Sequence, residues 1–173
     1  MENQVNSKSI MLNYGLILGV ISVLSSLTLY ATGNLIKFGW VAGIIGFIAM
    51  IVIITLGIKK FKLENNNILS FGQAVKVGIG IALISAVVGI IYNLIFLNFI
   101  EPGFQEQMME VQRQAWQEQN MTAEQIESAE GIAKTFSGPA ITSAFAILGS
   151  AFFGFIISAI GGAIMKRSAE DGY

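Results

Sequence analysis

The chain has 173 residues, of which 54% are hydrophobic and only 12% are charged, and its mean hydropathy is +0.67. Soluble domains carry about 25% charged residues, and a chain this short cannot bury so much apolar surface in a single core. The composition therefore indicates a protein whose solvent is lipid. The net charge of -1 argues against nucleic-acid binding, which requires a basic footprint.

The chain contains neither cysteine nor histidine. Without cysteine it cannot form disulfides, thiolate catalysts or cysteine-ligated metal sites. Without histidine it lacks the commonest general base and the imidazole metal ligand. No glycine-rich phosphate-binding motif with its lysine is present either. We therefore expect no cofactor, no metal centre and no enzymatic activity.

Four segments reach the length of about 20 apolar residues that a helix needs to cross the hydrocarbon core. We predict an all-α membrane protein forming one integral membrane domain over residues 1–173, with transmembrane helices at about 10–31, 38–58, 74–99 and 140–165. For the first segment the alternative is a cleaved signal peptide. Its apolar stretch is longer than the usual h-region of about 7–15 residues, which favours a retained span.

Local signals mark the starts of two of these helices. Ser70 and Gln73 have the spacing of a capping box, in which two side chains satisfy free amides at a helix start. Pro139 lies where the fourth span begins, and proline is tolerated in the first helical turn because no partner is needed there for its missing N–H.

The distribution of lysine and arginine predicts the orientation. With four spans, the two termini and the second connection share one face, which carries seven basic residues: Lys8, Lys59, Lys60, Lys62, Lys76, Lys166 and Arg167. The other face carries three: Lys37, Arg113 and Lys134. The positive-inside rule then places both termini and a loop at Lys59–Lys62 in the cytoplasm.

The segment 101–136 is the only long hydrophilic stretch, and this orientation places it outside the cytoplasm. Its seven glutamates against two basic residues, seven minus two, give a local charge of -5. Apolar residues recur at helical spacing on its first half (Phe104, Met108, Val111 and Ala115, with Met109 and Trp116 beside them). A second capping box at Thr122 and Gln125 precedes Ile126, Ala129, Ala133 and Phe136. We predict an amphipathic helical hairpin.

Two roles for this hairpin remain open. Its apolar stripe could fold on itself and on the outer ends of the spans, as such stripes usually do. Alternatively it could be a docking surface for a membrane-protein partner. Adaptable methionines and aromatic anchors suit such contacts, and the candidate residues are Phe104, Met108, Met109 and Trp116.

Small residues repeat along the spans, which is how helices in lipid approach closely. The fourth span has five of them, each four apart: Ala146, Ser150, Gly154, Ser158 and Gly162. The first span has Gly15 and Gly19 in a GxxxG pattern. These residues predict helix-packing interfaces, either within the chain or in a homo-oligomer or with a partner's helix.

The predicted spans contain no buried acidic residue, arginine or histidine, which are the usual marks of pumps and coupled transporters. Tyr92, Asn93 and Asn98 form the most polar group, and they either bond between helices or line a pathway. We therefore expect a non-catalytic scaffold or accessory subunit. The alternative is a passive channel or uncoupled carrier for a small or lipidic solute.

Three stretches, 70–76, 90–92 and 101–104, resemble a bacterial family catalogued as domain of unknown function 4199. Its members are typically small four-span inner-membrane proteins, so length, span layout and the long connection between spans three and four are also similar. The resemblance implies a location in the bacterial cytoplasmic membrane. It supplies no activity and no catalytic residues.

Overall fold

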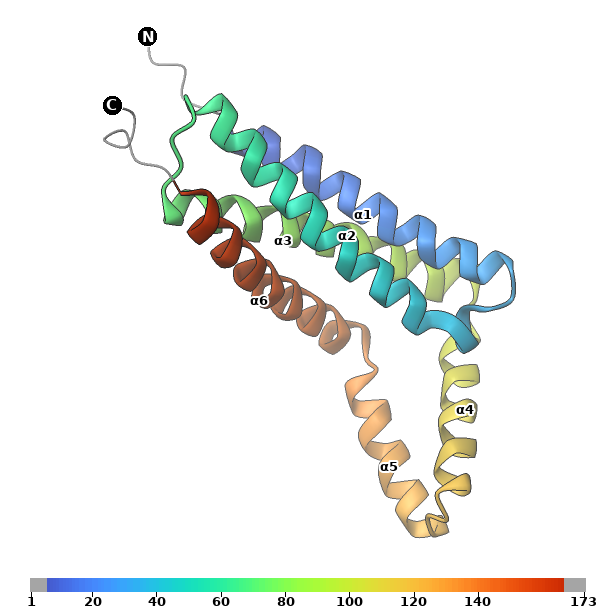
Figure 1. The fold of residues 1–173 in the computed structure, drawn as a ribbon. Coiled ribbons are helices and arrows are strands. Elements are labelled where there is room, and N and C mark those ends of the chain that lie inside the picture. The colour runs from blue at the N-terminus through green and yellow to red at the C-terminus, as the bar shows by residue number, and fades with distance from the viewer. Residues whose placement is uncertain (1–5, 167–173) are drawn as a thin grey trace. The chain divides into compact units, whose positions relative to one another are not determined.

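A computed structural model describes residues 6–166 (Figure 1), and these residues form six α-helices and one π-helical turn. The elements are α1 (Ser7–Ala31), α2 (Leu35–Glu64), α3 (Phe71–Ile95), η1 (Phe96–Ile100), α4 (Phe104–Glu118), α5 (Ala123–Phe136) and α6 (Pro139–Met165). Four helices, namely α1, α2, α3 continued by η1, and α6, are long and apolar enough to cross a membrane. The predicted all-α fold with four candidate spans is confirmed.

The largest departure from the predicted boundaries is at the end of α2. The prediction of a loop at Lys59–Lys62 is wrong, because the helix continues to Glu64. Tertiary contacts hold these extra turns: Phe61 is only 5% exposed, and the Lys62 ammonium donates a hydrogen bond to the Met165 carbonyl at 2.8 Å. Arg167, counted in the predicted cationic end of the fourth span, lies outside the described residues.

Both predicted capping boxes are present. The Ser70 amide donates to the Gln73 side chain at 2.9 Å, and the Gln73 amide donates to the Ser70 hydroxyl at 3.2 Å. Thr122 and Gln125 make the same reciprocal pair at the start of α5, at 2.8 and 3.3 Å. These starts follow from local chemistry alone.

The chain divides into two compact units, one of residues 1–89 and 147–173 and one of residues 90–146. The second unit contains the predicted insert 101–136. The core of the first unit draws on all four candidate spans and the connection before α3, and its buried residues include Leu18, Ile54, Ile58, Leu69, Val77, Ile81 and Ser158.

One side of α3 packs against α1 in the first unit. A Cβ atom added at Gly15 would lie 2.6 Å from Cβ of Ile84, and one added at Gly19 would lie 2.7 Å from Cβ of Val88. The contacts advance by four residues along both helices. The glycines of the GxxxG pattern are therefore the holes into which branched side chains of α3 fit.

Another side of α3 packs against α6 through small residues on both helices, a contact that we call the α3–α6 seam. A Cβ added at Gly154 would lie 2.7 Å from Cβ of Ala82, and one added at Gly162 would lie 2.8 Å from Cβ of Ala74. Between these pairs, Ser158 lies against Gly78. Neither helix can carry a larger residue at these positions without moving.

We expect Gly154→Ala to destabilise the first unit by about 1–3 kcal/mol, the usual cost of overpacking. The matched control is Gly149→Ala in the same helix, because a Cβ there meets nothing within 4 Å. Both changes improve helix propensity equally. The difference in stability between the two variants can be measured by thermal unfolding in detergent, monitored by circular dichroism. Equal melting temperatures for the two variants would contradict the seam.

Candidate functional site

The structure places the predicted small residues of α6 in three environments. Gly154, Ser158 and Gly162 are buried in the α3–α6 seam. Ser150 is half-buried, and Ala146, which belongs to the second unit, is exposed. These three buried residues thus already pack against a helix of the same chain. Substitutions at these positions are therefore expected to change the stability of the fold, whether or not a second protein binds.

The second unit contains a charged link between α4 and α5. The Arg113 guanidinium donates to Glu130 at 2.6 Å across the two helices and to Glu110 at 2.8 Å along α4. The Lys134 ammonium lies 3.8 Å from the second Glu130 oxygen. Glu130 is the best covered of these groups, with 15% of its side chain exposed. The link therefore shows which sides of α4 and α5 face each other.

The same geometry shifts two titrations. The hydrogen bond from Arg113, reinforced by its charge and by Lys134, holds the pKa of Glu130 below its ordinary value against the opposing effect of burial. Conversely, the hydrogen bond to Glu130 and its charge raise the pKa of Arg113. Both groups therefore stay ionised at neutral pH.

The side of α4 that faces α5 is rotated by about one residue from the predicted apolar stripe. Met109 and Trp116 are half-buried, on the same side as Arg113, whereas Met108 is 41% exposed and Val111 is also exposed. On α5, Ile126, Ala129 and Ala133 are half-buried as the pattern suggests, but Phe136, the fourth member of the predicted face, is 53% exposed and Ile132 is 62% exposed. Exposed apolar side chains are therefore left on both helices.

Two of these exposed side chains fall on one side of the α4–α5 pair. Met108 precedes the inward residue Met109 by one position, and Ile132 precedes the inward residue Ala133 by one position. One position is about 100° around a helix. Because α4 and α5 run in opposite directions from the turn that joins them (Figure 1), the same rotation brings both side chains to the same face. We call Met108 and Ile132 the apolar face of the pair.

Aromatic contacts connect α4 to the residues that precede it. The ring of Phe104 meets the ring of Phe96 edge to face at 5.3 Å, and Phe96 is buried at the start of η1. The side-chain amide of Gln105, also on α4, donates to the carbonyl of Ser137 just after α5 at 3.4 Å. Phe104 is thus a structural contact of the second unit rather than a free surface residue.

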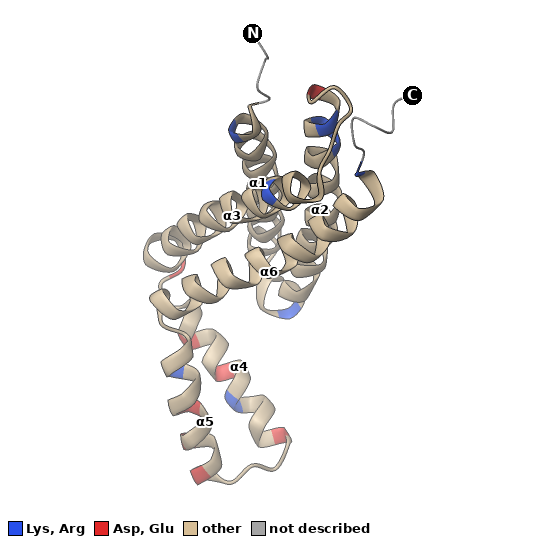
Figure 2. Ribbon diagram, turned by 90° about the vertical axis from the view of Figure 1, so that its left-hand side faces the viewer, with Lys and Arg blue, Asp and Glu red and all other residues tan. Residues whose placement is uncertain are grey.

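Figure 2 shows how charge is distributed along the helices, with glutamates on α4 and α5 and most lysines near the ends of the long helices. Glu106, Glu118, Glu124 and Glu127 are exposed. Among residues 6–166, no group of three or more acidic side chains is close enough to hold a metal ion. These exposed glutamates therefore form no cation site among the described residues.

The polar residues near the end of α3 do not enter the core. Asn93 and Asn98 are exposed, and the Asn98 amide donates to the Leu94 carbonyl of its own helix at 2.7 Å. The only polar side chain among the described residues that is buried is Ser158, whose hydroxyl donates to the Gly154 carbonyl at 2.6 Å. The Ser158 hydroxyl is therefore satisfied within its own helix.

Sequence comparison identifies the family. The family described as "Protein of unknown function (DUF4199)" matches residues 13–167. The chain belongs to this family. The match confirms the resemblance noted at 70–76, 90–92 and 101–104, and it includes α4, α5 and the four candidate spans except the start of α1. No curated protein and no solved structure matches the chain of this DUF4199 protein.

The sequence did not single out Arg113 or Glu130 as a pair in this DUF4199 protein. Arg113 is the one arginine among the seven glutamates of the segment 101–136, so a charge pair could be expected. All of those glutamates except Glu101 lie within about two turns of Arg113 or across the predicted turn, and spacing alone did not choose among them.

We expect the packing of α4 on α5 to weaken in acid. A carboxylate whose pKa is lowered by folding stabilises the folded state above its ordinary pKa, and this contribution is lost as the pH falls through the lowered value. Trp116 fluorescence, read in a Trp40→Phe background, should therefore change below pH of about 4. Glu130→Gln should already show the acid signal at neutral pH, and Glu127→Gln should not. Identical pH profiles for the two variants would contradict the assignment.

Proposed function

We propose that this DUF4199 protein is a non-catalytic integral membrane protein that acts as a scaffold or accessory subunit of a complex in the bacterial cytoplasmic membrane. One observation carries the proposal: Met108 and Ile132 form an exposed apolar face on helices that are not candidate spans. When a partner protein covers such side chains, apolar surface is removed from water. This burial favours association.

The orientation belongs to the same proposal. Lys59, Lys60 and Lys62 were predicted in the second loop. They lie instead in the last turns of α2, and thus on the same side of the membrane as that loop in the proposed topology. The basic count that favours cytoplasmic termini is therefore unchanged by the helical extension. In this orientation α4 and α5 lie outside the cytoplasm, and the partner contact is made there.

A passive passage for a solute has less support. Such a function needs polar groups along a path through the bundle, whereas the exposed Asn93 and Asn98 lie at the surface of the second unit. The exposed apolar face has no role in that alternative.

The orientation can be tested with single cysteines, because the chain has none of its own. We expect Gln119→Cys, in the turn after α4, to react with a membrane-impermeant maleimide from outside intact cells. Ser9→Cys, an exposed and nearly isosteric change at the start of α1, should react only after the cells are opened. The reverse pattern would invert the topology and place the apolar face in the cytoplasm.

The contact can be tested with a photoreactive amino acid placed at Met108 or Ile132 in native membranes. We expect one discrete adduct from both positions and little from Gln117, an exposed residue on another side of α4. Ile132→Lys should abolish the adduct formed from position 108, because an ammonium is costly to bury in an apolar contact. An adduct of twice the chain mass would identify the partner as a second copy. Equal labelling at Met108 and Gln117 would contradict a specific contact.

A further inference from the structure

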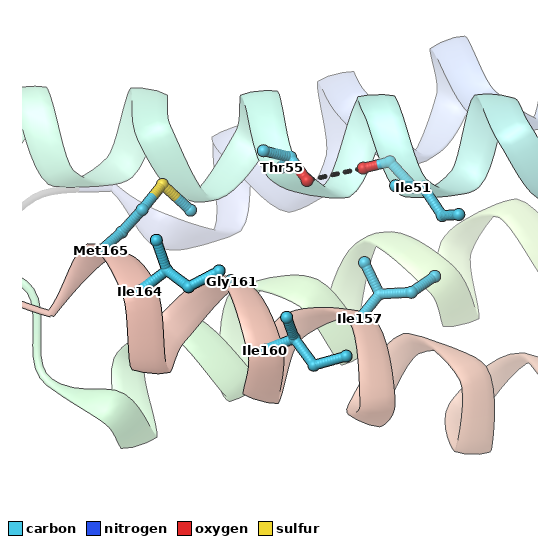
Figure 3. Close-up of a pocket in the computed structure, with 7 residues that line it drawn as sticks. All are labelled: Ile51, Thr55, Ile157, Ile160, Gly161, Ile164 and Met165. Atoms are coloured by element: carbon cyan, nitrogen blue, oxygen red, sulfur yellow. Dashed lines mark hydrogen bonds between the residues drawn. The ribbon is translucent and has the colours of Figure 1, made fainter.

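A groove of about 290 Å³ lies between α2 and α6 in the first unit (Figure 3). The α2 side is formed by Ile51 and Thr55, and the α6 side is formed by Ile157, Ile160, Gly161, Ile164 and Met165. The Thr55 hydroxyl donates to the Ile51 carbonyl at 2.7 Å, so it is already satisfied within its helix. The groove walls are therefore hydrocarbon in character.

Contacts between α2 and α6 occur on both sides of this groove along the helices. Phe47 and Phe153 meet edge to face with ring centres 5.6 Å apart, and Lys62 bonds to the Met165 carbonyl. Between these contacts Gly161 leaves space, because a Cβ there would reach only ordinary contact distances of 3.4 and 3.6 Å. The two helices are thus held together at both ends of a gap that neither fills.

One end of the groove is basic. Lys59 follows Thr55 by one helical turn and so continues the row of groove-lining residues on α2. The Lys62 ammonium is held at Met165, a residue of the groove wall, and uses one of its three donors there. Lys166 directly follows Met165 and is exposed. By contrast, Lys60 is paired with Glu64 at 3.1 Å.

We propose that this groove is a binding site for one anionic phospholipid, with an acyl chain between α2 and α6 and the phosphate at Lys59, Lys62 and Lys166. The charge of the groove end complements a phosphate, and the walls complement a hydrocarbon chain. A whole helix of about 10–12 Å diameter is too wide for a space of this size, whereas a single chain fits. Basic pockets between membrane helices on the cytoplasmic side bind anionic headgroups in this way.

The inference rests on the proposed membrane location but not on the partner contact at Met108 and Ile132. In the proposed orientation the basic end faces the cytoplasmic leaflet, whose anionic lipids supply the ligand. Binding in detergent does not depend on orientation. The lipid site and the proposed function can therefore fail separately.

The test is native mass spectrometry of the full-length protein purified in detergent. The protein is mixed with equal amounts of dioleoyl phosphatidylglycerol and dioleoyl phosphatidylcholine, which differ only in the headgroup. We expect one phosphatidylglycerol to be retained in preference to phosphatidylcholine. Lys59→Gln should weaken this retention by about fivefold, since each lysine near an anionic surface contributes about 1 kcal/mol, and Lys60→Gln should leave it nearly unchanged.

A second pair of variants tests the groove itself without changing charge. Thr55→Phe fills the groove and should abolish retention, whereas Leu56→Phe places the same aromatic ring at a neighbouring exposed position outside the lining and should retain the lipid. Equal loss in Lys59→Gln and Lys60→Gln would show diffuse attraction and overturn the site. Equal retention of the two lipids would also overturn it. So would a dimer that is present in the other variants but absent in Thr55→Phe, because the groove would then be occupied by a second copy of the chain.

Discussion

The α3–α6 seam is the contact on which the rest of the first unit depends. In lipid the hydrophobic effect does not draw helices together, so close van der Waals contact must do so. Residues of zero or one side-chain carbon allow that contact at Gly78, Ala82 and Gly154. Ser158 adds a hydroxyl at the most crowded point, and its bond to the Gly154 carbonyl removes the cost of burying it. The seam then fixes α3, whose other side receives α1.

This arrangement has a consequence for the outer surface. Because the small residues of α6 are used against α3, the bulky residues are left on its other faces, and Ile164 is 78% exposed. The α2 helix meets α6 through large side chains, at Phe47 and Phe153. Large side chains hold the two backbones apart, so a gap remains where the facing residue is a glycine, as at Gly161. The groove is therefore a product of how the two helices pack, and its lining side chains are apolar apart from Thr55, whose hydroxyl is bonded within α2.

Some of this structure could be predicted from the sequence because it is local. Span lengths follow from runs of apolar residues, and the starts at Ser70 and Thr122 follow from two side chains and two amides three residues apart. Partners could not be predicted in the same way. The period of Gly154, Ser158 and Gly162 identifies a face, but it does not say that α3 covers that face.

The second unit shows a different limit of sequence patterns. Met108 and Met109 are adjacent, so either can continue an apolar stripe, and periodicity alone favoured the stripe through Met108. The structure has the other rotation of α4, in which Met109 is half-buried on the side of Arg113 and Met108 is exposed. The bond from Arg113 to Glu130 marks this side as the one that faces α5. That bond spans 17 positions of the chain, which no window of neighbouring residues contains.

The lysines at the end of α2 bear both on the proposed orientation of the protein and on the proposed lipid site. For orientation in the membrane only their number near the span matters, because the positive-inside rule counts charges over short connections. For lipid binding their positions matter, because Lys59 continues the groove whereas Lys60 is paired with Glu64. The continuation of α2 beyond Ile58 is what creates this difference, since a helix assigns neighbouring residues to different sides and a loop does not. A predicted loop at Lys59–Lys62 would have made the three lysines equivalent; the helix makes them distinct.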